Sequence, residues 1–209
     1  MTTSEPERTL LLRIAREAID AHVRGVSRQS AVDSPQPAVD GPQSAVDGGQ
    51  SRVDNRLAET STLANRRGGV FVTIYRAGEL RGCIGHIEAD RALPVNVARC
   101  AVAACSEDPR FPAITAAELP EIQVEISLLG PLEPAAGPAD VEVGRHGLLI
   151  EMGRQHGLLL PQVATERNWD AATFLSQTCR KAGLAPDRWR HGAKVWRFEA
   201  DVFGDAPAH

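Results

Sequence analysis

The chain of 209 residues is mildly acidic, with a formal net charge of −4. Such a balance argues against a broad nucleic-acid-binding surface, which is normally basic. No apolar run approaches the roughly 20 residues that span a bilayer. The first residues also lack the basic and apolar segments of a secretory signal. We therefore expect a globular protein of the cytoplasm that makes no membrane contact.

The first expected element is an amphipathic helix over about 5–24. Ser4 and Glu7 fit a capping box at its start, and Gly25 suits a C-terminal cap. Apolar residues recur between them at helical spacing, namely Leu10, Leu11, Ile14, Ala18, Ile19 and Val23. This stripe is typical of a helix that packs on a core.

The next stretch, 27–54, contains three near-copies of a seven-residue unit at 34–40, 41–47 and 48–54. It holds no Leu, Ile, Met or aromatic residue, so it cannot bury enough apolar surface to offset the entropy cost of ordering. We expect a flexible insert in a surface loop of one domain that spans 1–209. A segment that docks on a partner is the alternative, although no anchor residue supports it.

A β-hairpin is expected over about 70–85. The run 70–75 is β-branched and aromatic, and 76–79 provides a turn that contains Gly78. The second strand carries Leu80-Arg81-Gly82-Cys83-Ile84-Gly85, in which a thiol lies between two glycines. Because glycine is unusual inside strands, this pattern indicates a close approach to the backbone or a bend.

Strand alternation predicts which residues of this motif share a face. Arg81, Cys83 and Gly85 are expected on the same face, with about 7 Å between successive members. A guanidinium beside a thiol would favour the reactive thiolate, and Gly85 would leave bare surface next to it. His86 would alternate to the opposite face, so the sequence places no base beside Cys83.

A second helix is expected to begin between 90 and 94 and to end before 106. The following loop, 106–112, carries Glu107, Asp108 and Arg110. Thr115 and Glu118 fit another capping box, which predicts a short helix. Strict alternation over 121–129 then predicts a half-buried strand.

The last third of the chain predicts another hairpin, a helix and a final strand. The hairpin pairs 146–152 with 157–160, and the helix is capped by Asp170 and closed by Gly183. The final strand is expected at 195–203. Since the strands come mostly as hairpins with no βαβ alternation, we predict an α+β fold with an antiparallel sheet and flanking helices.

The four cysteines do not predict a metal centre. Cys83, Cys100, Cys105 and Cys179 form no C-x-x-C pair, and no His or Cys lies at finger-like spacing from another. Cys100 and Cys105 are interpreted as small buried residues. We expect no metal and no cofactor.

Four motifs, in this order, resemble the AMMECR family. They are Leu80-Arg-Gly-Cys-Ile-Gly85, Glu107-Asp-Pro-Arg-Phe-Pro112, Gly157-Leu-Leu-Leu-Pro-Gln-Val163 and Cys179-Arg-Lys-Ala-Gly-Leu184. Bacterial and archaeal members of this family are called AmmeMemoRadiSam system protein A. The resemblance covers about residues 8–205 apart from the repeat, where a short loop would be expected.

The resemblance implies an α+β fold in two unequal lobes, with a cleft between them that the motifs border. It also implies association with a Memo-like protein related to non-haem iron dioxygenases, and with a radical S-adenosylmethionine (SAM) enzyme. It supplies no reaction. The expected cleft residues, besides Cys83 and Arg81, are Gly82, Gly85, Glu107, Asp108, Arg110, Gln162, Arg180 and Lys181.

Each candidate residue has a structural and a functional interpretation. Cys83 is either a small buried cysteine or a cleft-facing thiol that binds or reacts with a substrate, and a redox sensor is a further option. Arg81 lies on an exposed face, forms an ion pair with an acid such as Glu107 or Asp108, or binds an anion. The acids and Arg110 fix the loop or perform acid–base chemistry.

The later residues have the same two kinds of interpretation. Gln162 either makes a loop hydrogen bond or binds the polar edge of a ligand. A basic and aromatic cluster late in the chain is a solvated face or a contact for RNA or phosphate, and it comprises Arg180, Lys181, Arg188, Trp189 and Arg190.

Two functions therefore stay open. The first is a non-catalytic adaptor that works with the Memo-like and radical enzymes and could present a small molecule or nucleobase. The second is an enzyme that uses Cys83, beside Arg81, for thiolate chemistry. The absence of a visible nucleophile–base pair slightly favours the adaptor.

Overall fold

The computed structural model describes residues 3–29, 63 and 65–205. The chain divides into two compact units. The described residues of the larger unit are 3–29, 63, 65–126 and 203–205, and those of the smaller unit are 127–202. The predicted repeat insert lies, from residue 30 onward, outside the described residues.

Helix α1 (Glu5–Gln29) opens the larger unit and is longer than predicted. Its capping residues behave as expected, because the carboxylate of Glu7 accepts hydrogen bonds from the backbone N–H and the hydroxyl of Ser4. The buried stripe is Leu11, Ala15, Ile19 and Val23. Gly25 does not end the helix, so the predicted cap there was wrong.

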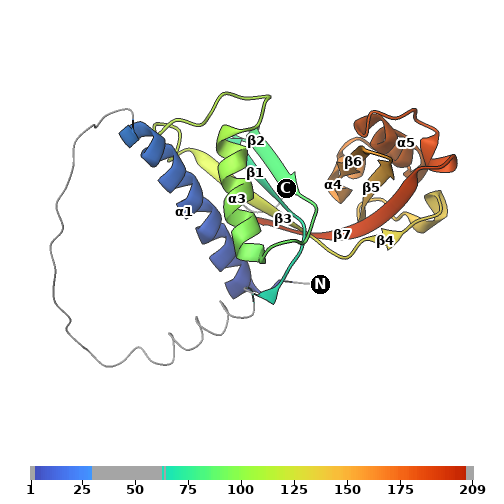
Figure 1. Ribbon diagram of the computed structural model, residues 1–209, viewed down its shortest axis with the longest axis horizontal. Coiled ribbons are helices and arrows are strands. Elements are labelled where there is room, and N and C mark those ends of the chain that lie inside the picture. The colour runs from blue at the N-terminus through green and yellow to red at the C-terminus, as the bar shows by residue number, and fades with distance from the viewer. Residues whose placement is uncertain (1–2, 30–62, 64, 206–209) are drawn as a thin grey trace. The chain divides into compact units, whose positions relative to one another are not determined.

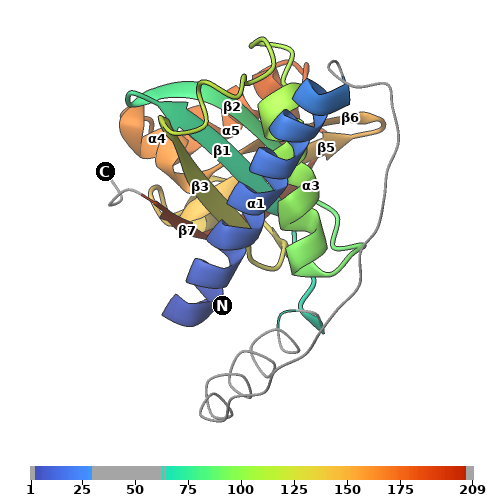
Figure 2. The same cartoon turned by 90° about the vertical axis from the view of Figure 1, so that its left-hand side faces the viewer.

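The larger unit contains an antiparallel sheet covered by two helices. Its strands are β1 (Val70–Arg76), β2 (Glu79–His86), β3 (Ile122–Leu129) and the last residues of β7 (Lys194–Gly204), hydrogen-bonded in the order β2-β1-β3-β7. Helix α3 (Leu93–Ser106) packs on β1 and β2 and lies beside α1 (Figures 1 and 2). Apolar residues of both helices and of β1 form the core between them, among them Leu11, Val72, Ile74, Val97 and Ala101.

The hairpin of β1 and β2 turns at Ala77 and Gly78, as predicted. Both residues have positive φ angles, 52° and 80°. A two-residue turn with both central residues in the left-handed region matches the right-handed twist of the paired strands. Position 77 therefore carries backbone strain that glycine would avoid, whereas Gly78 does not.

The register of the hairpin is interrupted at Arg81. Ile74 pairs with Gly82 and Tyr75 with Leu80, so Arg81 is the extra residue of a β-bulge. A bulge breaks the strict alternation of side chains. The premise that put Arg81 and Cys83 on one regular face was therefore wrong.

The smaller unit also has an antiparallel sheet with helices on it. Its strands β5 (His146–Met152) and β6 (Gln155–Leu159) follow β7 in the order β7-β5-β6, and β4 (Glu133–Pro134) pairs with β7. Helix α5 (Ala171–Lys181) packs on β5 and β6, and α4 (Pro161–Glu166) packs on β5. Two short 3₁₀ helices, Pro138–Asp140 and Arg188–Arg190, complete it.

The core of the smaller unit is closed by helix α5. Phe174, Leu175 and Cys179 of this helix pack with Leu148 and Ile150 of β5. The predicted ends of the helix are confirmed, since Asp170 accepts a 2.7 Å hydrogen bond from the N–H of Thr173 and Gly183 has a φ of 72°.

The predicted α+β class with an antiparallel sheet is confirmed. Two further local predictions were wrong. Residues 116–120 form turns and not a short helix, and α4 begins at Pro161, where only a strand end was expected. The cleft between two lobes stays a prediction. Among the described residues, no helix has the length and apolar character needed to cross a membrane.

Candidate functional site

The backbone of Cys83 is held by one acid and one arginine from the loop after α3. The N–H of Cys83 donates a 2.8 Å hydrogen bond to Asp108, and its carbonyl accepts one of 3.3 Å from Arg110. Asp108 and Arg110 also pair with each other at 2.7 Å. Hydrogen bonds from Arg110 hold the pKa of Asp108 well below its usual range, although its side chain is only 3% exposed. The loop therefore supplies the partners that a neighbouring strand would give.

The thiol of Cys83 is half-buried and faces Thr73. The hydroxyl of Thr73 donates a 3.2 Å hydrogen bond to Sγ, and the two residues are direct cross-strand partners. Burial raises the pKa of the Cys83 thiol, and the hydrogen bond from Thr73 and the nearby charge of Arg110 only partly oppose this effect. A raised pKa means that the neutral thiol predominates near pH 7.

Arg81 forms the ion pair that the sequence predicted, but with a different acid. Its Nε and Nη2 lie 2.9 and 3.3 Å from the two carboxylate oxygens of Glu118, and its Nη1 donates to the carbonyl of Pro112 at 2.7 Å. Neither Glu107 nor Asp108, the two acids named as examples, is its partner. Arg81 fixes the loop after α3 and does not activate the thiol.

Glu118 joins this cluster through the predicted capping pair. Its carboxylate accepts hydrogen bonds from the N–H and hydroxyl of Thr115, at 2.8 and 2.9 Å. Burial alone would raise the pKa of Glu118, but the hydrogen bonds from Arg81 and Thr115 outweigh it and lower the pKa to about 2. Glu118 is therefore a buried anion that is fully paired.

The two glycines of the motif are each covered by a neighbour. A Cβ on Gly82 would lie 2.1 Å from the backbone oxygen of Ala104 in α3, and a Cβ on Gly85 would lie 2.1 Å from the ring of Phe71. Phe71 and Gly85 are cross-strand partners, an arrangement in which an aromatic ring covers a glycine. The expectation of bare surface at Gly85 beside the thiol was wrong.

Strand β2 has an open edge at Gly85. In an antiparallel pair, the N–H and C=O of one residue point to the same side, and this side alternates along the strand. The N–H and C=O of Cys83 point away from β1, towards Asp108 and Arg110. Because Gly85 lies two residues further along β2, its N–H and C=O also point away from β1. Among the described residues, they have no hydrogen-bond partner.

A groove runs between this edge and α3, and we call it the β2–α3 groove. It has a volume of about 440 Å³ and is lined by Ile84, Gly85 and His86 of β2 and by residues of α3 that include Arg99, Val102 and Ala103. Ala18 of α1 and Glu107, which follows α3, also line it. His86 itself lies 3.4 Å from both Glu88 and Asp90 and does not approach the Cys83 thiol as a base.

The remaining predicted residues belong to the helices of the smaller unit. Gln162 lies in the first turn of α4, and Arg180 and Lys181 are in the last turn of α5, where cations are favoured by the helix dipole. In the basic and aromatic cluster, Arg190 covers the Trp189 ring at 4.5 Å. The Trp189 N–H donates to Ser176.

Sequence reasoning missed Thr73, Phe71 and Glu118 as parts of this site. Thr73 and Phe71 lie on β1, and a regular register counted from the turn would have paired them with Gly82 and Ile84, because the bulge at Arg81 shifts the observed pairs to Cys83 and Gly85. Glu118 was identified only as a capping residue. No local pattern connects it with Arg81.

Comparisons with known proteins extend over nearly the whole chain. A model of the AMMECR1 family matches residues 12–203. A protein of Methanothermobacter thermautotrophicus is 40% identical over 207 residues, which cover 96% of this chain and 95% of that protein. A protein of Methanococcoides burtonii is 36% identical over 208 residues, with coverages of 97% and 90%.

A solved structure is also similar. The crystal structure of an uncharacterized protein of Pyrococcus horikoshii, PH0010, has a TM-score of 0.77 and 32% sequence identity to this chain. The match covers 98% of this chain and 94% of that one. These proteins carry no described activity, so the similarity supports the fold and the motifs but not a reaction.

Proposed function

We propose, because the chain belongs to the AMMECR1 family, that it is a cytoplasmic adaptor of an AmmeMemoRadiSam system and that it binds protein partners at the open edge of β2. The partners are a Memo-like protein and a radical SAM enzyme. The observation that carries the proposal is the unpaired backbone of Gly85 beside the β2–α3 groove. An exposed edge next to a helix is suited to bind an extended peptide.

The occupant we propose is an extended segment of a partner with an apolar side chain. Its backbone would donate to the carbonyl of Gly85 and accept from its N–H. The apolar side chain would enter the groove against Val102 and Ala103, which are half-buried. Asp108 and Arg110 already bind the backbone of Cys83 at this edge. A partner segment can therefore pair only with the residues of β2 that follow Cys83.

The surroundings of Cys83 argue against the alternative, an enzyme that uses its thiolate. The thiol has a raised pKa, and its hydrogen-bond partner is the hydroxyl of Thr73, which cannot act as a strong base. Catalytic cysteines normally have a lowered pKa and a base within reach. We therefore assign the motif a structural role in shaping the edge of β2.

The test measures binding of the full chain to purified Memo-like and radical SAM proteins from the same organism. Ala103→Lys places a charge in the β2–α3 groove, and we expect it to weaken partner binding by about tenfold or more, typical of a charge placed in an apolar interface. Val95→Lys is the matched control, because Val95 is an exposed residue of the same helix outside the groove. Cys83→Ser should bind like the unmodified chain.

Either of two results would contradict the proposal. One is a wild-type chain that binds neither partner at micromolar concentration. The other is an Ala103→Lys variant that binds as tightly as Val95→Lys. If Cys83→Ser stays folded but abolishes a reaction catalysed by the chain, the thiol-enzyme alternative replaces the adaptor.

A further inference from the structure

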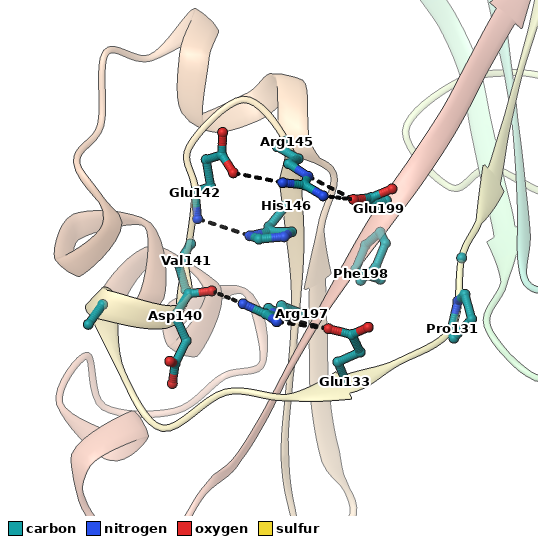
Figure 3. Close-up of a pocket in the computed structure, with 12 residues that line it drawn as sticks. Pro131, Glu133, Asp140, Val141, Glu142, Arg145, His146, Arg197, Phe198 and Glu199 are labelled. Carbon is teal, nitrogen blue, oxygen red and sulfur yellow. Dashed lines mark hydrogen bonds and ion pairs between the residues drawn. The ribbon is translucent and has the colours of Figure 1, made fainter. Parts of the chain in front are cut away.

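The smaller unit contains a polar cavity of about 690 Å³ whose lining includes none of the predicted site residues. Figure 3 shows it between the loop that follows β3 and the strands β5 and β7. Its volume falls in the range of small-molecule sites, roughly 300–1,000 Å³. The charged residues around it are Glu133, Asp140, Glu142, Arg145, Arg197 and Glu199.

The buried group of this cavity is His146, which is only 8% exposed. Its Nδ1 accepts a 2.9 Å hydrogen bond from the backbone N–H of Glu142. The proton of the neutral ring must therefore lie on Nε2, which makes that atom a hydrogen-bond donor. Within the described part of the chain, Nε2 has no partner, and the ring lies between the Arg145–Glu199 and Arg197–Glu133 pairs (Figure 3).

The two arginines of the cavity are already occupied by carboxylates. Arg145 lies 2.7 Å from Glu199 and 3.1 Å from Glu142. Arg197 lies 2.9 Å from Glu133 and donates to the carbonyl of Asp140 at 2.7 Å. An anionic ligand would have to displace these internal partners.

The four carboxylates, in contrast, each keep one open oxygen. Glu133, Glu142 and Glu199 accept from the arginines through a single oxygen atom, and Asp140 accepts from Ala136 through one. The other oxygens have no partner among the described residues. Burial, with Arg197 and Arg145 nearby, lowers the pKa of His146, so the histidine is neutral near pH 7. With four acids and two arginines, the lining has a formal charge of 2 − 4 = −2.

We propose that this cavity binds a small organic cation that carries an ammonium group and a neutral oxygen acceptor. The ammonium group would donate to the open carboxylate oxygens, and the acceptor would take the hydrogen bond from Nε2 of His146. A metal ion is a poorer fit, because no group of three or more acids, histidines or cysteines among the described residues is arranged to hold one. The proposal is independent of the proposed function, since the β2–α3 groove lies in the larger unit.

The test compares three probes built on one scaffold. In slightly acidic solution serinamide is a cation, serine is a zwitterion and N-acetylserine is an anion, and all three carry a hydroxyl and a carbonyl oxygen. Their binding to the full chain is followed by NMR through the imidazole signals of His146 and the backbone amides around it. We expect affinity to fall in the order serinamide, serine, N-acetylserine, with shifts centred on His146.

Variants test whether the carboxylates are responsible. The double variant Glu133→Gln with Glu199→Gln removes two exposed charges, and we expect it to weaken serinamide binding by about fivefold or more. Glu166→Gln is the matched control, since this exposed acid of α4 lies outside the cavity. The proposal is overturned if N-acetylserine binds more tightly than serinamide, if serinamide causes no shift at millimolar concentration, or if the double variant binds serinamide like the control.

Discussion

Glu118 receives hydrogen bonds from three residues of the larger unit. Arg81 and Thr115 are described above, and Arg76 approaches to 3.2 Å. The side chains of Glu118 and Arg81 are 11% and 14% exposed, so each would be a nearly buried charge without the other. Removing one partner of a buried ion pair usually costs more than the pair itself contributes.

At this residue scale we predict that Glu118→Gln lowers the free energy of unfolding by about 2–4 kcal/mol, because Arg81 is left without a counter-charge. Urea denaturation near pH 7 measures this change. Glu121→Gln is the matched control, since Glu121 pairs with Arg76 on the surface at 2.8 Å. It should change the free energy of unfolding by less than about 1 kcal/mol.

The same variant should also alter the pH dependence of stability. The pKa of Glu118 is lowered from 4.5 to about 2 in the folded chain, so the unfolded chain binds more protons between these values. The carboxylate therefore stabilises the fold above pH 4.5, and this contribution is lost as the pH falls towards 2. The gap between wild type and Glu118→Gln should narrow over that range. A constant gap would contradict the ion-pair explanation.

The sequence predicted the kind of contact that Arg81 makes but not its partner. An arginine on a strand near the core needs an acid, which is a general requirement. The choice between Glu107, Asp108 and Glu118 depends on how the loop after α3 folds back over β2, and Glu118 lies 37 residues from Arg81 in the chain. Pairs at fixed short spacing, such as Thr115 with Glu118, were predicted because their geometry is local.

The contact between β2 and α3 at Gly82 belongs to the scale of elements. The helix backbone approaches so closely that a Cβ at position 82 would overlap the carbonyl oxygen of Ala104. A backbone atom cannot rotate away as a side chain can. Any larger residue at position 82 therefore has to displace the helix from the sheet.

We predict that Gly82→Ala lowers the free energy of unfolding by about 1–3 kcal/mol, the usual cost of overpacking. Gly25→Ala is the matched control, because Gly25 is an exposed residue of α1 with nothing within 4 Å of the added Cβ. That variant should be stabilising by roughly 0.5–1 kcal/mol, since alanine favours a helix. Thermal or urea unfolding of both variants measures the two changes in the free energy of unfolding. Changes of the same sign and size would contradict the packing explanation.

Most elements were predictable because their signals are periodic or local. The alternation at 121–129, the Ala77-Gly78 turn and the cap at Asp170 each gave an element close to its observed place. The bulge at Arg81 was not predictable, since it depends on the hydrogen bonds that the loop offers to β2. For the same reason, the two faces of the motif were assigned from a regular strand that the chain does not form.

At the scale of the whole molecule, Asp205 connects three segments of the larger unit. Its carboxylate pairs with Arg16 of α1 and accepts a 2.8 Å hydrogen bond from the N–H of Val124 in β3. Its own N–H donates to the carbonyl of Val124 at 3.0 Å. The end of β7 is thereby fastened to elements that precede it by more than 80 residues.

We predict that Asp205→Ala lowers the free energy of unfolding by about 1–3 kcal/mol, because it removes a charge-assisted hydrogen bond and leaves the N–H of Val124 without its acceptor. Glu17→Ala, which breaks the exposed Arg13–Glu17 pair, should cost less than about 1 kcal/mol. Hydrogen exchange should show the loss of protection in α1 and β3 and not in α5. Uniform loss over both units would contradict a local role.

The division of the chain also bears on the order in which its parts fold during synthesis. All residues of the smaller unit that the structure describes are contiguous, 127–202, whereas the larger unit is completed by residues that follow them. All described residues of the smaller unit therefore leave the ribosome before Phe203 and Asp205 do. The unit that begins first is finished last, and the β2 edge is present on a nascent chain before the last residues of β7 have emerged.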